Sequence, residues 1–373
     1  MVLLEWIKTK SNLTKRICLG TIMASSFALI IYNGPLAILA TITAVQMKCF
    51  SEIIELAYAA KKVPKDEKLR TINCYFMFVA NYFYYGELFK LRFGVFAQTM
   101  AIIKVLMTYH KFVSFCLYLI GFVWFVLSLT TTPIKRRTKF SLFFWTHFLS
   151  LIIVLQSALM GNLVFEGLIW CIVPISMVVL NDVWAFMFGK LYGKTPLIEL
   201  SPNKTMEGYI YGALMTIATG CLLSHVLCHF QYFVCPVSYI ETNGGIRIAT
   251  ECEPDYNFTP VNFYGVKTFP FLVHALVLST YASIVAPFGG FMASGFKRAM
   301  KVKDFGDVIP GHGGMMDRND CQYLMATFIN VYLYTFVKTD VEHLYKRILH
   351  LNDDHQLEFY HLMEEHLKQI KLL

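Results

Sequence analysis

The chain has 373 residues, of which 56% are hydrophobic and 16% are aromatic, and its mean hydropathy is +0.51. This composition excludes an ordinary soluble globular domain and predicts an all-α, polytopic membrane protein. The formal net charge of +8 comes from 33 Lys and Arg against 25 Asp and Glu, and the basic residues lie in clusters.

Runs of about 17 to 25 apolar residues predict about nine transmembrane helices. The clearest runs are 112–129, 140–160, 163–180, 208–228 and 271–293, and the weaker ones are 17–32, 35–50, 71–86 and 321–337. Residues 94–109 are not counted, because Gln98 and Lys104 interrupt them and their apolar side chains recur at helical spacing. That pattern favours an interfacial amphipathic helix.

Basic clusters precede the first span, follow the second and separate the fourth from the fifth. Their members are Lys8, Lys10, Lys15, Arg16, Lys61, Lys62, Lys65, Lys68, Arg70, Lys135, Arg136, Arg137 and Lys139. The positive-inside rule places all three clusters on the cytosolic face. Counting the spans forward then places two polar insertions, 189–207 and 294–320, on that same face and the loop 229–270 in the lumen.

Three regions are expected along the chain. Residues 1–160 hold the N-terminal transmembrane and interfacial helices, 161–340 form a transmembrane region with both polar insertions, and 341–373 form an amphipathic tail. Most of the ten cysteines lie in apolar runs, where Cys behaves as a small hydrophobe. Cys235 and Cys252 fall in the expected lumenal loop, where the environment is oxidising, and they are either bridged or free.

The first polar insertion follows Asp182, which stands at the membrane end of an apolar run. A carboxylate in that place usually meets a cation or a metal, and a helix cap or a simple ion pair is the alternative. Further on, Ser201 or Thr205 is suited to cap the next helix, which leaves backbone amides for phosphate oxygens. Capping alone does not explain the added cations Lys194 and Lys204.

The second polar insertion concentrates charge around a glycine-rich turn. Its cations are Lys297, Arg298, Lys301, Lys303 and Arg318, and its acids are Asp304, Asp307, Asp317 and Asp320. The turn, residues 311–314, surrounds His312 with glycines, so the backbone can approach a ligand closely. Acids at the start of the following helix would complement its dipole, but that explains one acid and not nine charges in 27 residues. The pattern predicts a site for phosphate chemistry with a divalent metal.

These motifs resemble the signature of the CDP-diacylglycerol synthases, also called phosphatidate cytidylyltransferases. The matching residues are Ser294, Lys297, Arg298, Lys303, Asp304, Pro310, Gly311, His312, Gly313, Gly314, Asp317, Arg318 and Asp320, with Ser201, Pro202, Lys204, Thr205, Glu207 and Gly208 upstream. The similarity is to the eukaryotic branch and covers nearly the whole chain. The chain departs from the pattern at Met206, where the family has Trp, and at Gly290 and Ala293, where bacterial members carry acids. Asp182 is expected to supply the missing carboxylate.

The resemblance implies that CTP and phosphatidic acid react to give CDP-diacylglycerol and pyrophosphate, for the synthesis of phospholipids such as phosphatidylinositol. It implies Mg²⁺ as cofactor, held by Asp317, Asp182 and Asp320. Catalytic roles are expected for Asp317, His312, Lys303, Asp304 and Arg318, and substrate binding for Ser201, Lys204, Thr205, Glu207, Ser294, Lys297, Arg298, Gly313 and Gly314. The expected setting is the endoplasmic reticulum membrane, with the active site facing the cytosol. The expected partners are the lipid bilayer and a second copy of the chain, and no nucleic acid.

Two other functions would also place charges among membrane spans. A CTP-dependent polyprenol kinase needs similar cations and acids, but the full motif from Ser294 to Asp320 argues against it. A membrane transporter would carry charges near the middle of the bilayer on broken helices and would show paired half-repeats. Here the charges lie at one face, and no repeat is evident in the sequence.

Overall fold

The computed structural model describes residues 12–60, 67–97, 101–131, 134–202, 204–237, 239–242, 245–248, 252–263, 265–306, 313–338, 344–345, 348 and 353–369. Most of these residues are helical. The helices of the first half are α2 (Asn12–Tyr32), α3 (Pro35–Ala60), α4 (Glu67–Ala97), α5 (Ala101–Thr108), α6 (His110–Thr131), α7 (Arg136–Leu149), the π-helix η1 (Ser150–Val154) and α8 (Leu155–Phe165). Those of the second half are α9 (Leu168–Tyr192), α10 (Met206–Leu227), α11 (Gln231–Val234), η2 (Tyr256–Phe258), α12 (Phe271–Ile284), α13 (Pro287–Ala299), α14 (Met316–Tyr332), the π-helix η3 (Leu333–Val337) and α16 (Asp353–Gln369).

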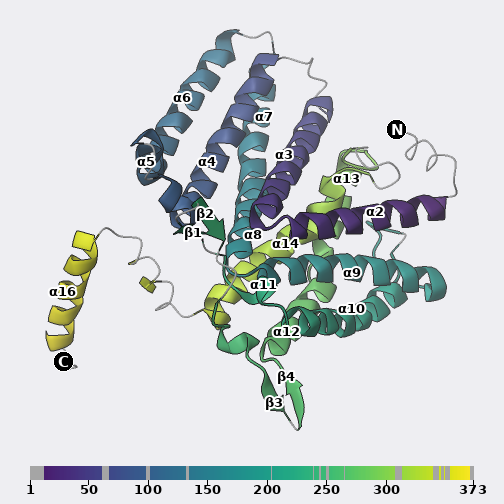
Figure 1. The fold of residues 1–373 in the computed structure, drawn as a ribbon. Coiled ribbons are helices and arrows are strands. Elements are labelled where there is room, and N and C mark those ends of the chain that lie inside the picture. The colour runs from purple at the N-terminus through teal and green to yellow at the C-terminus, as the bar shows by residue number, and fades with distance from the viewer. Residues whose placement is uncertain are drawn as a thin grey trace.

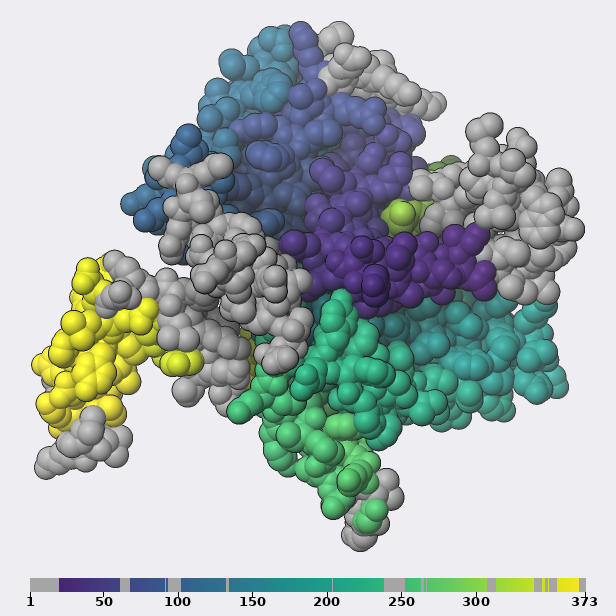
Figure 2. Space-filling model, viewed as in Figure 1, coloured from purple at the N-terminus to yellow at the C-terminus, as the bar shows by residue number. Residues whose placement is uncertain are grey.

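The helices form two groups that meet at α14. Figure 1 shows α3, α4, α6 and α7 running alongside one another, while α2, α9 and α10 cross near one end of that group. In Figure 2, α2 is a purple band between the N-terminal helices and the teal α9 and α10. Helix α14 packs on α3, α8, α9 and α13, so its first turn lies where both halves of the chain meet.

The expected number of nine spans is not confirmed. Six helical segments of the described chain are long and apolar enough to cross a membrane: Pro35–Ala60, His110–Thr131, Arg136–Phe165, Leu168–Tyr192, Met206–Leu227 and Phe271–Ala299. The expected spans 71–86 and 321–337 are helical but do not qualify, because charged residues flank or enter their helices and shorten the apolar part. The expected span 17–32 contains the shorter apolar helical stretch Gly20–Tyr32.

The segment expected to lie at the membrane surface contains the short helix α5. Its eight residues rise about 12 Å, and the hydrocarbon core of a bilayer is about 30 Å thick, so α5 is too short to cross. The tail contains α16, which is largely exposed and stands apart from the helix bundle in Figure 1.

Small residues at intervals of four let α10 pack closely on α9. Its buried positions are Gly208, Gly212, Thr216, Gly220 and Ser224. A Cβ atom at Gly212 would lie 2.9 Å from the Cα of Ala185 on α9, and one at Gly208 would lie 2.6 Å from the Ala185 carbonyl oxygen. Such close backbone approach is typical of small-residue interfaces between membrane helices. This packing fixes the ends of α9 and α10 that carry the first insertion.

The segment between α11 and α12 departs from the all-α prediction. It contains two antiparallel hairpins, β1 (Tyr239–Thr242) with β2 (Gly245–Ile248) and β3 (Val261–Phe263) with β4 (Val266–Thr268). The register pairs Tyr239 with Ile248 in the first hairpin and Val261 with Thr268 in the second. A disulfide joins Cys235 to Cys252, which decides between the two alternatives left by the sequence.

Candidate active site

The candidate active site lies around the first turn of α14, where both polar insertions converge. The first insertion connects α9 to α10, and the second connects α13 to α14. Gly290 of α13 faces this turn: a Cβ atom there would lie 3.6 Å from Asp320 Oδ2 and 3.8 Å from Lys204 Nζ. A residue of each insertion therefore reaches the same point.

Asp320 is the partly buried acid of this meeting point. Burial raises the pKa of its carboxyl to about 6; the backbone N–H of Cys321, which it accepts at 2.8 Å, opposes the rise. The nearby Asp182 carboxylate raises the pKa further, and the Lys204 ammonium lowers it. The Lys204 ammonium also lies 4.9 Å from the centre of the Phe291 ring, as in a cation–π contact. Asp320 and Lys204 thus meet beside Gly290, the Asp182 carboxylate acts on Asp320 electrostatically, and burial favours the neutral form of Asp320.

Asp317 lies one turn earlier on α14, and its carboxylate is fully engaged within the protein. Its Oδ1 atom is 2.5 Å from Lys297 Nζ, and its Oδ2 atom accepts the backbone N–H groups of Phe305 and Gly314, both at 3.0 Å. The side chain is 5% exposed, and that of Lys297 is 16% exposed. Asp317 therefore joins the last turn of α13 to the backbone at Phe305 and at Gly314, and these contacts occupy both of its oxygens.

The glycine turn is shaped by the acids that surround it. Gly313 has φ +79°, a left-handed conformation that favours glycine. A Cβ atom there would lie 3.1 Å from Asp317 Oδ2 and 3.3 Å from Asp304 Oδ1. The glycine accordingly makes room for two carboxylates of the protein itself. His312, Gly311 and Asp307, which the sequence also pointed to, lie outside the described residues.

The first insertion is held in shape by Glu207 and Thr205. The Glu207 carboxylate accepts the backbone N–H of Lys194 at 3.0 Å and the hydroxyl of Thr195 at 2.9 Å. Thr205 caps α10, because its hydroxyl oxygen accepts the Gly208 N–H at 3.2 Å. Both side chains therefore have structural partners, and the capping alternative for Thr205 is confirmed.

The other predicted residues differ in how open they are to solvent. The exposed ones are the cations Arg298, Lys303 and Arg318 and the acids Asp182 and Asp304. The partly buried ones are Ser201 and Ser294. Exposed cations on α13, on α14 and between these helices are suited to bind a polyanionic molecule that arrives from water.

Glu52 is a member of the site that the sequence interpretation missed. It lies on α3, more than 260 residues before α14, and is 5% exposed. Its Oε1 accepts the N–H of Met315 at 2.8 Å, and its Oε2 accepts that of Met316 at 2.9 Å. A buried acid within a helix long and apolar enough to cross a membrane was the available signal.

A Mg²⁺ ion fits the carboxylates of Asp320 and Asp182 better than it fits that of Asp317. In the part of the chain that the structure describes, no group of three or more His, Cys, Asp or Glu side chains is placed to hold a metal. Mg²⁺ nevertheless needs only one or two carboxylates when substrate phosphates and waters complete its shell. Asp320 meets this requirement, with Asp182 near enough to act on it electrostatically, whereas Asp317 would first have to release Lys297.

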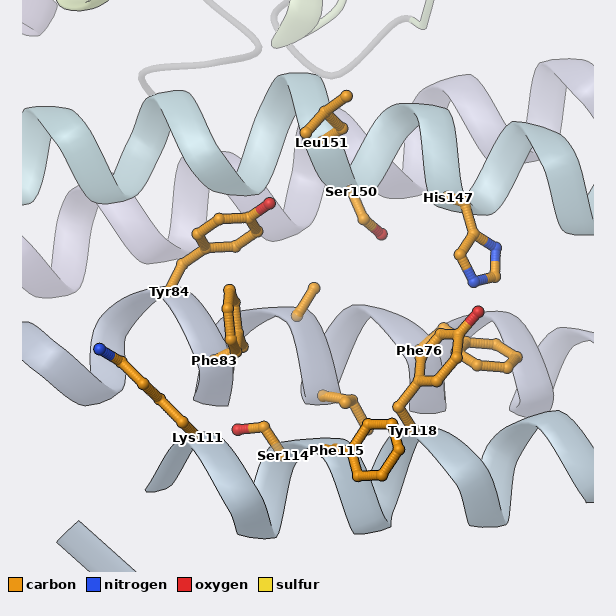
Figure 3. A pocket seen from close by; sticks show the side chains of 12 residues that line it. Phe76, Phe83, Tyr84, Lys111, Ser114, Phe115, Tyr118, His147, Ser150 and Leu151 are labelled. Atoms are coloured by element: carbon orange, nitrogen blue, oxygen red, sulfur yellow. The ribbon is translucent and has the colours of Figure 1, made fainter. Parts of the chain in front are cut away.

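A cavity of about 470 Å³ lies elsewhere, between α4, α6, α7 and η1 (Figure 3). Its lining is mainly aromatic and aliphatic, with hydroxyl groups such as Ser114 and Ser150. Its one lysine, Lys111, already pairs with Glu87 at 3.0 Å. This lining lacks the cations that a triphosphate needs, so the cavity is not the site of phosphate chemistry.

Fold and site together define a multi-pass helical membrane protein with a cluster of acids and cations at one end of its helices, as membrane enzymes of phosphate chemistry require. The profile of the cytidylyltransferase family matches residues 14–336. The chain is similar to phosphatidate cytidylyltransferase 2 of Homo sapiens, at 45% identity over 358 residues, which cover 92% of this chain and 80% of the relative. It is 44% identical to phosphatidate cytidylyltransferase 1 of Rattus norvegicus and 42% identical to phosphatidate cytidylyltransferase of Caenorhabditis elegans; each match covers 94% of this chain and 78% of the relative. The chain belongs to the cytidylyltransferase family.

Proposed function

We infer that this chain catalyses phosphatidate cytidylyl transfer, which makes CDP-diacylglycerol from CTP and phosphatidic acid. An oxygen of the phosphatidate phosphate attacks the α-phosphorus of CTP, and a new P–O–P linkage forms. The bond from the α-phosphorus to the oxygen that bridges it to the β-phosphorus breaks, and pyrophosphate leaves with that oxygen. The observation that carries this proposal is the meeting of Asp320 and Lys204 beside Gly290, with the Asp182 carboxylate near enough to raise the pKa of Asp320.

Electrostatic repulsion is the main barrier that such a site has to lower. Two unit charges 4 Å apart repel by about 4 kcal/mol at an effective dielectric constant near a protein surface. Both substrates are anionic, so several such charge–charge repulsions oppose their approach. Lys204 near Asp320 and the exposed Arg298, Lys303 and Arg318 are positioned to offset them.

Asp182 and Asp320 are the residues that we propose to hold Mg²⁺. Mg²⁺ bound there would supply positive charge to the phosphate oxygens of CTP and of the incoming lipid. The attacking phosphate is already ionised at neutral pH, so the mechanism does not demand a strong general base. Lys297, Asp317, Thr205 and Glu207 keep the surrounding backbone in place through the contacts described above.

The setting of the reaction follows from the distribution of charge. The basic clusters favour a cytosolic position for both insertions, so CTP arrives from the cytosol while phosphatidic acid keeps its acyl chains in the bilayer. We propose the endoplasmic reticulum membrane and a homodimer, on the basis of the resemblance to the eukaryotic branch.

Purified protein in lipid micelles, given CTP labelled in the cytidine, phosphatidic acid and Mg²⁺, tests the reaction. Cytidine label that enters the organic phase only when phosphatidic acid is present supports cytidylyl transfer. A parallel reaction with γ-labelled CTP and a polyprenol tests the kinase alternative, because a kinase transfers only the terminal phosphate. Absence of phosphatidate-dependent cytidine transfer would refute the proposal.

A further inference from the structure

Two carboxylates, those of Asp317 and Glu52, contact the backbone on both sides of residues 307–312. The flanking residues, 305–306 on one side and 313–316 on the other, are here called the loop stem. Asp317 accepts N–H groups from both ends of the stem, at Phe305 and Gly314. Glu52 reaches the same stem from α3.

Glu52 supplies a cap that α14 does not carry in its own sequence. The N-cap residue of α14 is Met315, which makes no capping side-chain hydrogen bond. The first N–H groups of a helix lack intrahelical partners and need acceptors when they are buried. Glu52 accepts two of them, at 2.8 Å and 2.9 Å, and its negative charge also complements the positive end of the helix dipole.

Two glycines of the stem make room for this carboxylate. A Cβ atom at Gly314 would lie 2.6 Å from Glu52 Oε2, and one at Gly306 would lie 3.0 Å from Glu52 Oε1. The Cβ atom at Gly314 would also lie 2.8 Å from the backbone nitrogen of Gly306, so the two ends of the stem touch. The carboxylate therefore fits a space that larger residues at these two positions would fill.

We propose that Glu52 is a positioning residue for cytidylyl transfer: it fixes the first turn of α14 and the loop stem, and thereby the place of Asp320 relative to Asp182 and Lys204. The proposal rests on the proposed function of those three residues. It gives the N-terminal half of the chain a defined task in the reaction. Glu52 itself is not assigned to substrate or metal, because both of its oxygens are occupied by backbone amides.

Glu52→Gln tests the proposal with almost no change in side-chain volume. The amide keeps one acceptor oxygen and turns an NH₂ group toward a backbone N–H, so one capping bond becomes a clash between donors. We expect kcat/KM to fall roughly 10- to 100-fold, the range that follows from losing a hydrogen bond to a charged group. We also expect more Mg²⁺ to be needed for half-maximal activity, because Asp320 is displaced.

Hydrogen exchange gives a readout that does not depend on activity. The Met315 and Met316 amides should exchange faster in Glu52→Gln, while amides of the α9–α10 interface keep the exchange rates of the wild type. The matched control is Glu55→Gln, one turn along the same helix, where Glu55 pairs with Arg70 on the surface at 2.7 Å. Exposed pairs contribute little to stability, so this control should behave as the wild type does.

Gly306→Ala keeps the proposal testable if Glu52→Gln does not fold. Its Cβ atom would press on the Glu52 carboxylate, and its effect should not add to that of Glu52→Gln because both act on one contact. Activity within about twofold of wild type, with unchanged exchange at Met315 and Met316, would overturn the proposal in whichever variant folds. A different result would refute the proposed function and not the role of Glu52 in the fold. In that case the wild-type protein has no phosphatidate-dependent activity, while the Met315 and Met316 amides still exchange faster in the variant.

Discussion

Asp317→Asn is expected to destabilise the fold as well as to lower activity. The Asp317 carboxylate is buried against Lys297 and two backbone amides, so the variant leaves a mostly buried ammonium group without its counter-charge. Removing one partner of a buried ion pair typically costs about 3–5 kcal/mol. Since Lys297 remains 16% exposed, we expect a loss near the lower end, about 3 kcal/mol.

Asp320→Asn is the matched comparison, three residues further along the same helix. The pKa of Asp320 is raised from 3.8 to about 6, so ionising this group opposes folding at neutral pH when no cation is bound. That shift corresponds to a penalty on the order of 3 kcal/mol, which the neutral amide does not incur. We therefore expect metal-free Asp320→Asn to be as stable as the wild type or more stable, while Mg²⁺-dependent turnover is lost.

Both variants can be compared in one detergent, with EDTA present, by the midpoint of denaturant unfolding. Cytidine transfer from labelled CTP to phosphatidic acid is then measured after Mg²⁺ is added. Wild-type stability of Asp317→Asn together with destabilisation of Asp320→Asn would refute the reasoning. That result would make Asp317 the principal metal ligand and Asp320 a structural acid.

Three further predictions concern pH, the first insertion and helix packing. The folded state binds more protons at Asp320 than the unfolded state between pH 3.8 and about 6, so metal-free protein should lose stability as the pH rises through that window. The Mg²⁺ concentration for half-maximal activity should rise as the pH falls below about 6, and a constant value would contradict this. Lys204→Met should lower kcat/KM roughly 10- to 100-fold, with Lys204→Arg less affected, and equal losses in both variants would contradict a role for the charge. Gly212→Val should reduce stability in thermal unfolding by about 1–3 kcal/mol, because its side chain meets Ala185 at 2.9 Å. Gly20→Val, with nothing within 4 Å, is the control; equal stability of the two variants would disprove the packing argument.

Local features of the site were predictable from the sequence because they depend on neighbouring residues. Thr205 precedes an apolar helix and caps it, as its type and position indicate. The polar stretch ending at Asp320 interrupts apolar runs, and such a stretch in a membrane protein predicts a functional surface. The number of spans was less predictable, because charges at the ends of α4 and α14 shorten their apolar parts.

The partner of each carboxylate was not predictable in the same way. The sequence does not distinguish the environments of Asp182, Asp317 and Asp320. In the structure Asp182 is exposed, Asp317 pairs with Lys297, and Asp320 is partly buried near Lys204. Glu52 lay outside the motifs, since its partners are backbone amides that follow it by more than 260 residues.

The sequence by itself determined the membrane class, the two charged insertions and the family signature, because composition, hydropathy and motif spacing are properties of the linear chain. Only the tertiary structure decided which acid faces a cation, which faces another acid and which caps a distant helix. The physical reason is that burial and charge–charge distance set the energy of a carboxylate, and both depend on how α3, α9, α13 and α14 pack together.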